Sequence, residues 1–332
     1  MSLDIAVTKP HDALAEALSA ELRAVNTLIR DRMASEHAPR IPEVTAHLIE
    51  AGGKRLRPML TLAAAGICGY DGPFHIHLAA SVEFIHTATL LHDDVVDESA
   101  QRRGRPTANL LWDNTSSVLV GDYLFARSFQ LTVETGKLKV LDILANASAT
   151  IAEGEVLQLT AARNLETTVD TYIMIARGKT AALFSAAAEA GAVIAQAPDT
   201  VSAALHLYGD ALGVAFQIVD DLLDYSGSDA IGKNRGDDFR EGKLTLPVIY
   251  AIEAGTTQER AFWQRTIGRG KDEPADLDAA MALFAKYGTL EKTREDALYW
   301  AAQARDALSD VPKGPLSDML AGIASYVVDR IQ

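Results

Sequence analysis

Two stretches of this sequence carry the same acidic pattern: LLHDDVVDES at residues 90–99 and QIVDDLLDYS at residues 217–226. Each contains Asp-Asp-x-x-Asp, and each follows an apolar run, HTATLL in the first case and GVAFQIV in the second. Residues three and four positions apart lie on the same face of a helix, so the three carboxylates of each copy are expected to crowd together. The pair therefore predicts two helices that share one site.

Crowded carboxylates inside apolar sequence need a counter-charge, because without one they become protonated or destabilise the fold. Divalent cations that prefer oxygen ligands supply this charge, and magnesium is the simplest choice. A single copy of the pattern is more often a solvated helix face, but two copies with the same spacing favour a metal site. The predicted metal ligands are Asp93, Asp94, Asp97, Asp220, Asp221 and Asp224.

The remainder of the chain has helical periodicity, interrupted by glycine and proline, and lacks the alternating pattern of strands. Expected helices cover residues 12–35, 42–51, 58–67, 74–98, 114–135, 138–163, 169–189, 200–225, 246–253, 257–266, 277–286, 289–308 and 316–331. The fold class is therefore all-α. Because no linker divides the 332 residues, we expect a single domain over 1–332.

Composition narrows the possible partners and locations. The net charge of −14 argues against nucleic acid as a general partner, because nucleic-acid binders need basic patches. Cys68 is the single cysteine, which rules out an intrachain disulfide framework and fits a reducing compartment. The first residues, MSLDIAVTKPHD, lack a signal-peptide pattern, and no uncharged apolar run approaches the length of a spanning helix. We expect a cytoplasmic protein without a transmembrane segment.

Basic residues are scarce, and several lie where they would meet an anionic substrate. The stretch AGGKRLRP, residues 51–58, places three cations within four residues between two helices, which suits a diphosphate; a capped helix end with solvated side chains is the alternative. Arg102 and Arg103 follow the first acidic cluster by one or two helical turns. There they would stand beside phosphate oxygens, which arginine binds in a bidentate manner.

Three lysines and two uncharged polar residues complete the set of candidates. Lys179, Lys233 and Lys243 are each compatible with an ordinary surface role, but Lys179 precedes an almost wholly apolar helix, which places it at a cavity rim. His86 and Gln217 lie on the two segments that carry the acidic clusters. A lone histidine there is more often a core residue, yet its spacing aims His86 to roughly the same helix face as Asp93.

Eight motifs together resemble those of trans-type polyprenyl diphosphate synthases, in particular the long-chain members that make ubiquinone side-chain precursors. In chain order they are GGKRLRP, EFIHTATLLHDDVVDES, RRGRPTAN, VLVGDYLFARSF, EGEVLQL, RGKTAALF, GVAFQIVDDLLDY and GKNRGDDFREGKLTLP. They run from Gly52 to Pro247, about three-fifths of the chain. The resemblance implies the isoprenoid synthase type I fold, a single large orthogonal helical bundle around a deep central cavity.

The resemblance also implies residue roles. The six aspartates would bind three magnesium ions, and Asp93, Asp94, Asp97, Lys179, Asp220, Asp221 and Lys233 are the catalytic candidates. Contacts to an allylic diphosphate would come from Arg102, Lys179 and Lys233. Contacts to isopentenyl diphosphate would come from Lys54, Arg57, His86 and Arg103. Thr180 and Gln217 would line the reaction centre, and Lys243 would help to close the segment after the second acidic motif.

The implied reaction is magnesium-dependent, repeated head-to-tail (1'-4) condensation of isopentenyl diphosphate onto an allylic diphosphate such as farnesyl diphosphate. Residues four, five and eight before Asp93 are Thr89, Ala88 and Ile85, and a helix points them at the cavity wall beneath the diphosphate. In short-chain relatives bulky aromatics occupy the first two positions. The small residues here imply a long product (C40–C50), decaprenyl first and octaprenyl or solanesyl second, although helix packing also explains them.

Three alternatives stand beside this reading. A type-I terpene cyclase shares the metal chemistry but has no second diphosphate site, so the basic residues Lys54, Arg57 and Arg103 disfavour it. A non-catalytic subunit of a heteromeric synthase would bind prenyl diphosphates without turnover, and the intact acidic clusters disfavour that. A helical metal-binding structural protein is the third. The family is typically homodimeric, so we expect a homodimer.

Overall fold

Helices make up nearly all of the regular structure in this computed structural model, which describes residues 9–50, 52–102, 104–226 and 235–331. The α-helices are α1 (Pro10–Ala17), α2 (Ser19–Met33), α3 (Arg40–Glu50), α4 (Leu56–Ile67), α5 (Phe74–Val96), α6 (Ala108–Leu111), α7 (Asn114–Glu134), α8 (Leu138–Ala161), α9 (Val169–Ala176), α10 (Ala182–Ile194), α11 (Asp199–Ser226), α12 (Asp237–Glu241), α13 (Leu246–Ala254), α14 (Thr257–Trp263), α15 (Asp276–Tyr287), α16 (Thr289–Ala307) and α17 (Pro315–Asp329). Two π-helical turns, η1 (Arg177–Ala181) and η3 (Gln264–Gly268), and one 3-10 turn, η4 (Leu308–Asp310), interrupt them. In these ranges the one sheet is the antiparallel pair β1 (Gln101–Arg102) and β2 (Arg105–Pro106). The predicted all-α class is confirmed.

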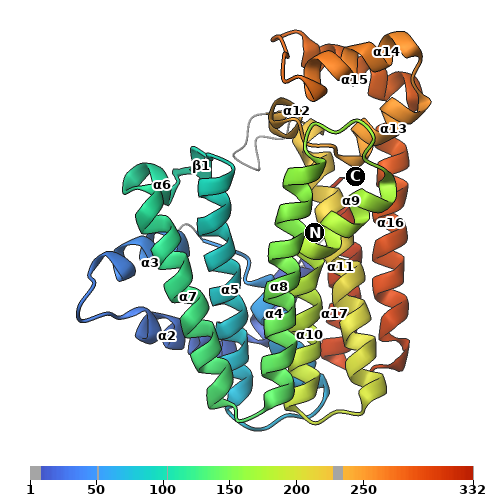
Figure 1. The fold of residues 1–332 in the computed structure, drawn as a ribbon. Helices are drawn as coiled ribbons and strands as arrows, with labels where there is room; N and C mark the ends of the chain where they lie inside the picture. The colour runs from blue at the N-terminus through green and yellow to red at the C-terminus, as the bar shows by residue number, and fades with distance from the viewer. Residues whose placement is uncertain (1–8, 51, 103, 227–234, 332) are drawn as a thin grey trace, which may run out of the picture.

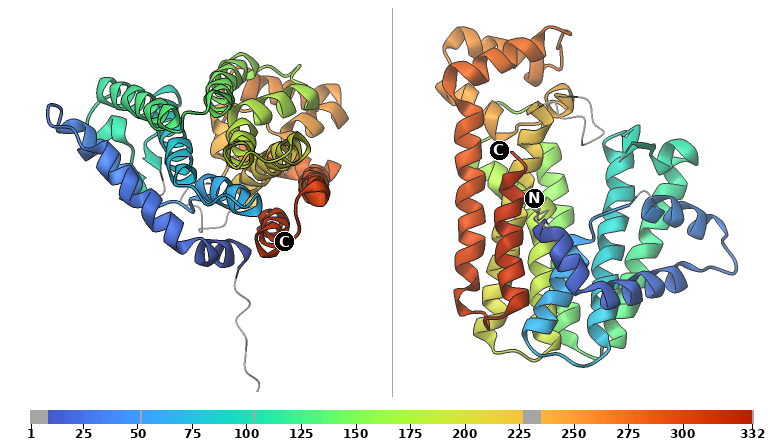
Figure 2. Two further views of the ribbon diagram at one scale, coloured as in Figure 1. Left: turned by 90° about the horizontal axis from the view of Figure 1, so that it is seen from below. Right: turned by 180° about the vertical axis from the view of Figure 1, so that it is seen from behind.

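The long helices run side by side as a bundle, and α14 with α15 forms a separate layer at one end (Figure 1). An end-on view shows α1 and α2 along one flank (Figure 2). The most extensive packing joins α5 with α7, α10 with α11 and α4, and α11 with α16. Helix α10 is rich in alanine and almost wholly buried, since small side chains allow its neighbours to approach closely. It forms the centre of the core.

Helices α5 and α11 bring the two acidic motifs together. The first motif lies at the C-terminal end of α5, which has 23 residues, and the second lies at the C-terminal end of α11, which has 28. Both ends point to the same end of the bundle, near β1 and α12 (Figure 1). At about 1.5 Å per residue, α5 extends for roughly 35 Å from this end towards the opposite one. The bundle is thus long enough to offer a deep path beside the acidic motifs.

Backbone contact between helices depends on glycine at a few positions. A Cβ atom on Gly209 of α11 would lie 2.5 Å from the Cα of Ser185 and 2.6 Å from the carbonyl oxygen of Phe184. A Cβ atom on Gly154 of α8 would lie 2.6 Å from the backbone nitrogen of Lys179. These contacts are shorter than carbon atoms tolerate, so only glycine allows α10 and η1 to touch their neighbours. They hold α10 against α11 and η1 against α8.

Several helix boundaries differ from the sequence-based expectation. The segment predicted as one helix over 12–35 is two helices, because Leu18 leaves the helical conformation with φ −104° and ψ 19°. The segment predicted over 169–189 contains the π-helical turn η1, where tertiary packing overrides the regular periodicity. The β1–β2 hairpin was not expected. Residue 51, the last of the helix expected over 42–51, lies outside the described residues.

Among the helices of the described ranges, none combines the length with the apolar composition that a bilayer crossing needs.

Replacing Gly209 with alanine should destabilise the protein by about 1–3 kcal/mol, because the new methyl group must push α10 and α11 apart. Gly322 of α17 is the matched control: its Cβ would lie 3.5 Å from Pro10, an ordinary contact. Gly322→Ala should therefore be neutral or stabilising by up to about 1 kcal/mol. Urea unfolding followed by circular dichroism measures both, and equal midpoints for the two variants would contradict this account of the packing.

Candidate active site

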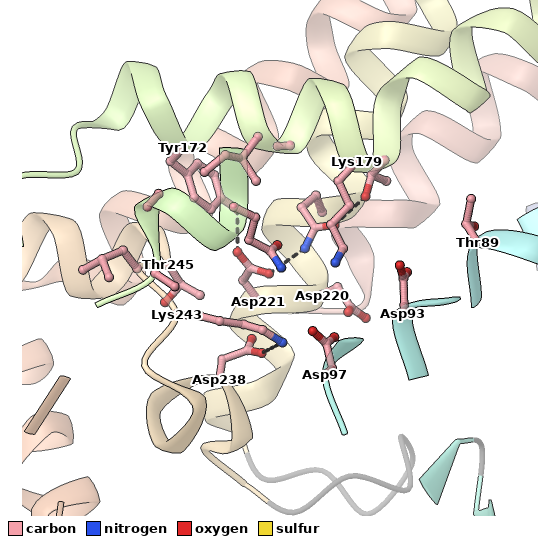
Figure 3. A pocket seen from close by; sticks show the side chains of 18 of the residues that line it. Thr89, Asp93, Asp97, Tyr172, Lys179, Asp220, Asp221, Asp238, Lys243 and Thr245 are labelled. Carbon is pink, nitrogen blue, oxygen red and sulfur yellow. Dashed lines mark hydrogen bonds and ion pairs between the residues drawn. The ribbon is translucent and has the colours of Figure 1, made fainter. Parts of the chain in front are cut away.

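A pocket with a volume of about 230 Å³ opens at the shared end of α5, α8, α9, η1 and α11 (Figure 3). Its walls combine acidic, basic and neutral polar side chains that lie far apart in the sequence. The predicted site residues that line it are Arg57, His86, Thr89, Asp93, Asp97, Arg102, Lys179, Thr180, Gln217, Asp220, Asp221 and Lys243. The structure therefore gathers most of the predicted site into one place.

The first acidic cluster divides between the pocket and the interior. Asp93 and Asp97 line the pocket, whereas Asp94 is completely buried. The Asp94 Oδ1 atom accepts a hydrogen bond from Arg102 Nε at 2.8 Å and lies 2.7 Å from a second guanidinium nitrogen of the same residue. The carboxylate of Asp94 therefore holds Arg102 at the pocket wall.

The second cluster divides in a similar way. Asp220 and Asp221 line the pocket, and Asp221 accepts hydrogen bonds from Tyr172 and Gln217. Asp224 is buried, and its two oxygens accept hydrogen bonds from the backbone N–H groups of Asp237 and Asp238, each at 3.2 Å. Asp224 thus fixes the start of α12. The proposed roles of Asp94 and Asp224 as metal ligands stay predictions.

Each lysine of the pocket already has an acidic partner. Lys179 Nζ lies 3.0 Å from Glu155 Oε2. Lys243 Nζ lies 3.3 Å from Asp238 Oδ1 and 2.5 Å from Glu241 Oε2. These ion pairs hold the ammonium groups at the pocket, where an incoming anion would compete for them.

The remaining pocket groups are held by aromatic and hydrogen-bond contacts. The guanidinium of Arg57 stacks over the Phe184 ring at 4.4 Å from its centroid and lies 3.2 Å from His86 Nε2. The hydroxyl of Thr180 donates to Gln217 Oε1 at 2.6 Å. These contacts leave the pocket with fixed donors and acceptors on several walls.

Burial makes the negative charge of the pocket unfavourable. It raises the pKa of Asp93 to about 7; Lys179 opposes the shift, while Glu155 and Asp97 add to it. Burial and the charge of Asp238 also raise the pKa of Asp221. Burial would lower the pKa of Lys243, but Asp238 and Glu241 raise it overall. The surroundings of Asp93 and Asp221 would therefore be stabilised by an additional cation.

The arrangement of the carboxylates decides which kind of cation fits. In the ranges that the structure describes, no three His, Cys, Asp or Glu side chains are close enough to enclose a metal ion on their own. Magnesium usually binds through one or two carboxylates and takes its other ligands from water and phosphate. The oxygens of Asp93, Asp97 and Asp220, spread over two walls, fit a magnesium ion that arrives with a phosphorylated substrate.

Some predicted residues lie elsewhere. Lys54 is exposed as a residue, with its Nζ 5.8 Å from the Tyr326 ring centroid; partial desolvation of its ammonium group and then the charge of Arg330 lower its pKa. Ile85 and Ala88 are fully buried, so only Thr89 of the chain-length candidates lines the described pocket. Arg103 and Lys233 lie outside the described residues.

The structure adds pocket groups that the sequence did not single out. These are Tyr172, Asp238, Gln158 and Thr245, together with Glu155, the partner of Lys179. The motifs EGEVLQL and GKNRGDDFREGKLTLP contain Glu155, Gln158, Asp238 and Thr245, but nothing in one sequence assigned them a role. Tyr172 had no signal, because its contact with α11 depends on tertiary packing.

Known proteins resemble this chain over most of its length. The model of the family described as "Polyprenyl synthetase" matches residues 38–284. Octaprenyl diphosphate synthase of Escherichia coli (strain K12) is 41% identical over 316 residues, which is 95% of this chain and 97% of the relative.

Two crystal structures resemble the fold and the sequence together. A decaprenyl diphosphate synthase from Rhodobacter capsulatus is 69% identical, with a TM-score of 0.94 over 97% of this chain and 99% of the other. A polyprenyl synthase from Caulobacter crescentus CB15, in complex with calcium and isoprenyl diphosphate, is 50% identical, with a TM-score of 0.92 over 96% and 97%. The chain belongs to the polyprenyl synthetase family and is a prenyltransferase.

Proposed function

We propose that the protein catalyses the magnesium-dependent, sequential condensation of isopentenyl diphosphate onto an allylic diphosphate such as farnesyl diphosphate. The observation that carries this proposal is the meeting of Asp93 and Asp97 from α5 with Asp220 from α11 in one pocket that also presents cations (Figure 3). The calcium and isoprenyl diphosphate bound by the Caulobacter relative support the same pairing of divalent cation and diphosphate.

The pocket has suitable groups for two diphosphates. Arg102 and Lys179 lie on the walls that carry the acidic residues and would bind the allylic diphosphate. Arg57 and His86 lie together, 3.2 Å apart, and would bind isopentenyl diphosphate. This second basic group distinguishes the proposed condensation from the cyclisation of a single diphosphate. Arg103, Lys233 and Lys54 extend the two groups in the proposal.

The side chains then favour ionisation of the allylic C–O bond. When bound by Asp93, Asp97 and Asp220, magnesium would supply positive charge that stabilises the departing pyrophosphate. Arg102 and Lys179 would add fixed donors to the same anion, without reorganisation of solvent. Thr180 and Gln217 would lie beside the reacting carbons. The isopentenyl double bond forms the new C–C bond, and the pyrophosphate takes the proton that is lost.

We further propose a product of eight to ten isoprene units, with ten favoured, for a ubiquinone side chain. The relatives that support this length are octaprenyl and decaprenyl diphosphate synthases. Thr89 is a small residue at the pocket wall, and Ala88 beside it is a small residue packed in the core. The tail would extend from there along α5.

A cytoplasmic homodimer is also part of the proposal. Helices α7 and α8 carry large apolar side chains that are exposed in the single chain, which favours a protein contact. They are Val118, Leu119, Val133, Leu138, Val156 and Leu159.

The direct test is to incubate the purified protein with farnesyl diphosphate, labelled isopentenyl diphosphate and magnesium, and to read product length by reversed-phase chromatography after dephosphorylation. A dominant product of eight to ten units is expected. The absence of elongation, with both diphosphates bound, would contradict the proposal and indicate a missing partner subunit or a non-catalytic role.

Asp93→Asn should lower the elongation rate at least about 100-fold, because it removes a charged ligand from the pocket. The pKa of Asp93 is raised to about 7, so the fold disfavours its charged form and stability falls as the pH rises from about 4 towards 7. In the absence of magnesium, Asp93→Asn should therefore raise the melting temperature at pH 8 more than at pH 5.

Asp306→Asn, on the exposed face of α16, is the control and should change neither activity nor the pH dependence of melting. A wild-type elongation rate in Asp93→Asn would contradict the metal-ligand assignment.

Thr89→Phe should shorten the product ladder, because the ring would fill the space beneath the diphosphate where the tail extends. Ala88→Phe should act in the same direction while also straining the core. Thr200→Phe, an equal change at an exposed position of α11, should leave the chromatogram unchanged. An unaltered ladder in both α5 variants would mean that the tail follows another route.

A further inference from the structure

Four side chains beside the pocket form a continuous chain of hydrogen bonds. Tyr172 of α9 donates its hydroxyl to Asp221 Oδ2 at 2.6 Å, and Gln217 Nε2 donates to Asp221 Oδ1 at 2.8 Å. Thr180 of η1 donates its hydroxyl to Gln217 Oε1 at 2.6 Å. Figure 3 shows the link between Tyr172 and Asp221 at the pocket wall. We call these four residues the relay.

The hydrogen bonds of the relay converge on Asp221 from both ends. An ionised Asp221 can only accept hydrogen bonds, so the amide nitrogen of Gln217 faces Asp221 and its oxygen faces Thr180. The Thr180 hydroxyl then directs its proton into the relay and keeps its lone pairs for the pocket, which Thr180 lines. The orientation of Asp221 therefore sets the polarity of Thr180.

Tyr172 is the rigid end of the relay. Its side chain is 5% exposed and belongs to the hydrophobic core. The side chain of Thr168 caps the start of α9 by accepting a hydrogen bond from the backbone N–H of Thr171. A buried tyrosine hydroxyl needs a partner, and here the partner is a carboxylate. Since α9 continues directly into η1, Tyr172 and Thr180 lie on one backbone segment, and the relay closes a ring between that segment and α11.

We propose that Tyr172 is a positioning residue for prenyl transfer: its hydroxyl fixes the carboxylate of Asp221, which orients Gln217 and, through it, Thr180 at the reacting carbons. This inference rests on the proposed function. Tyr172 acts through its neighbours, so its loss should reduce the rate of the chemical step and leave substrate binding unchanged. A tyrosine that only fills the core would affect stability alone.

Tyr172→Phe removes the hydroxyl and keeps the ring. We expect kcat to fall about tenfold, as for other residues that orient a reacting group, with the KM for both diphosphates unchanged. Tyr208→Phe is the matched control, since Tyr208 is also buried and donates its hydroxyl to the carbonyl oxygen of Leu320 at 2.8 Å, outside the pocket. Tyr208→Phe should lower the melting temperature about as much as Tyr172→Phe does, because each variant loses one buried hydroxyl. Unlike Tyr172→Phe, it should leave kcat unchanged.

A double-mutant cycle tests the path of the effect. Thr180→Val removes the far hydroxyl of the relay with little change in volume, and Thr180 bonds to Gln217 whereas Tyr172 bonds to Asp221. If the relay couples them, adding Tyr172→Phe to Thr180→Val should lower kcat by less than about twofold further. Gln217→Leu, which opens the relay in the middle, should remove the effect of Tyr172→Phe in the same way.

Several outcomes would overturn the inference. The relay is excluded if Tyr172→Phe has the kcat of the wild-type protein. It is also excluded if the fold-loss in kcat of the double mutant equals the product of the losses in Tyr172→Phe and Thr180→Val. A crystal structure of Tyr172→Phe in which Asp221, Gln217 and Thr180 keep their positions also excludes it, whatever the rate. These results leave the elongation by the wild-type protein intact, whereas a wild-type protein that does not elongate overturns the proposed function itself.

Discussion

Mutual repulsion among buried carboxylates is the constraint on which this structure depends. Two Asp-Asp-x-x-Asp motifs at the ends of α5 and α11 would destabilise the bundle if all their charges faced one another. The fold gives some of them fixed partners: Asp94 pairs with Arg102, and Asp224 accepts the backbone N–H groups that begin α12. Asp93, Asp97 and Asp220 are left for the pocket. Each motif thus supplies residues both to the fold and to the pocket wall.

The cations of the pocket obey the same constraint. Lys179 and Lys243 are held by Glu155, Asp238 and Glu241, so the lysines and carboxylates stabilise one another without a ligand. A diphosphate bound in the proposed manner would exchange one set of ion pairs for another, so its binding free energy would be smaller than its number of contacts suggests. A metal ion that arrives with the substrate would offset the acidic side of this exchange.

The sequence was sufficient for the fold class and for most of the pocket, because helical periodicity and the spacing of the acidic motifs are local properties. It was insufficient for the orientation of individual side chains, that is, for which of them face the pocket. Whether Asp94 or Asp97 faces the pocket depends on Arg102, which comes from the next segment. The contact of Tyr172 with Asp221 joins residues 49 positions apart, and no local pattern marks it. Ile85 and Ala88 have the predicted spacing, yet the packing of neighbouring helices encloses them.

The π-helical turn η1 has a consequence for how this chain tolerates change. A π turn holds one residue more than an α turn, so it accommodates that residue without changing the rotation of one flanking helix against the other. Deletion of a single residue within 177–181 would restore a regular helix and leave the flanks in register, but it would redirect the side chains of the turn itself, among them Lys179 and Thr180 of the pocket. The extra residue therefore shapes the pocket wall, whereas the packing of the bundle does not require it.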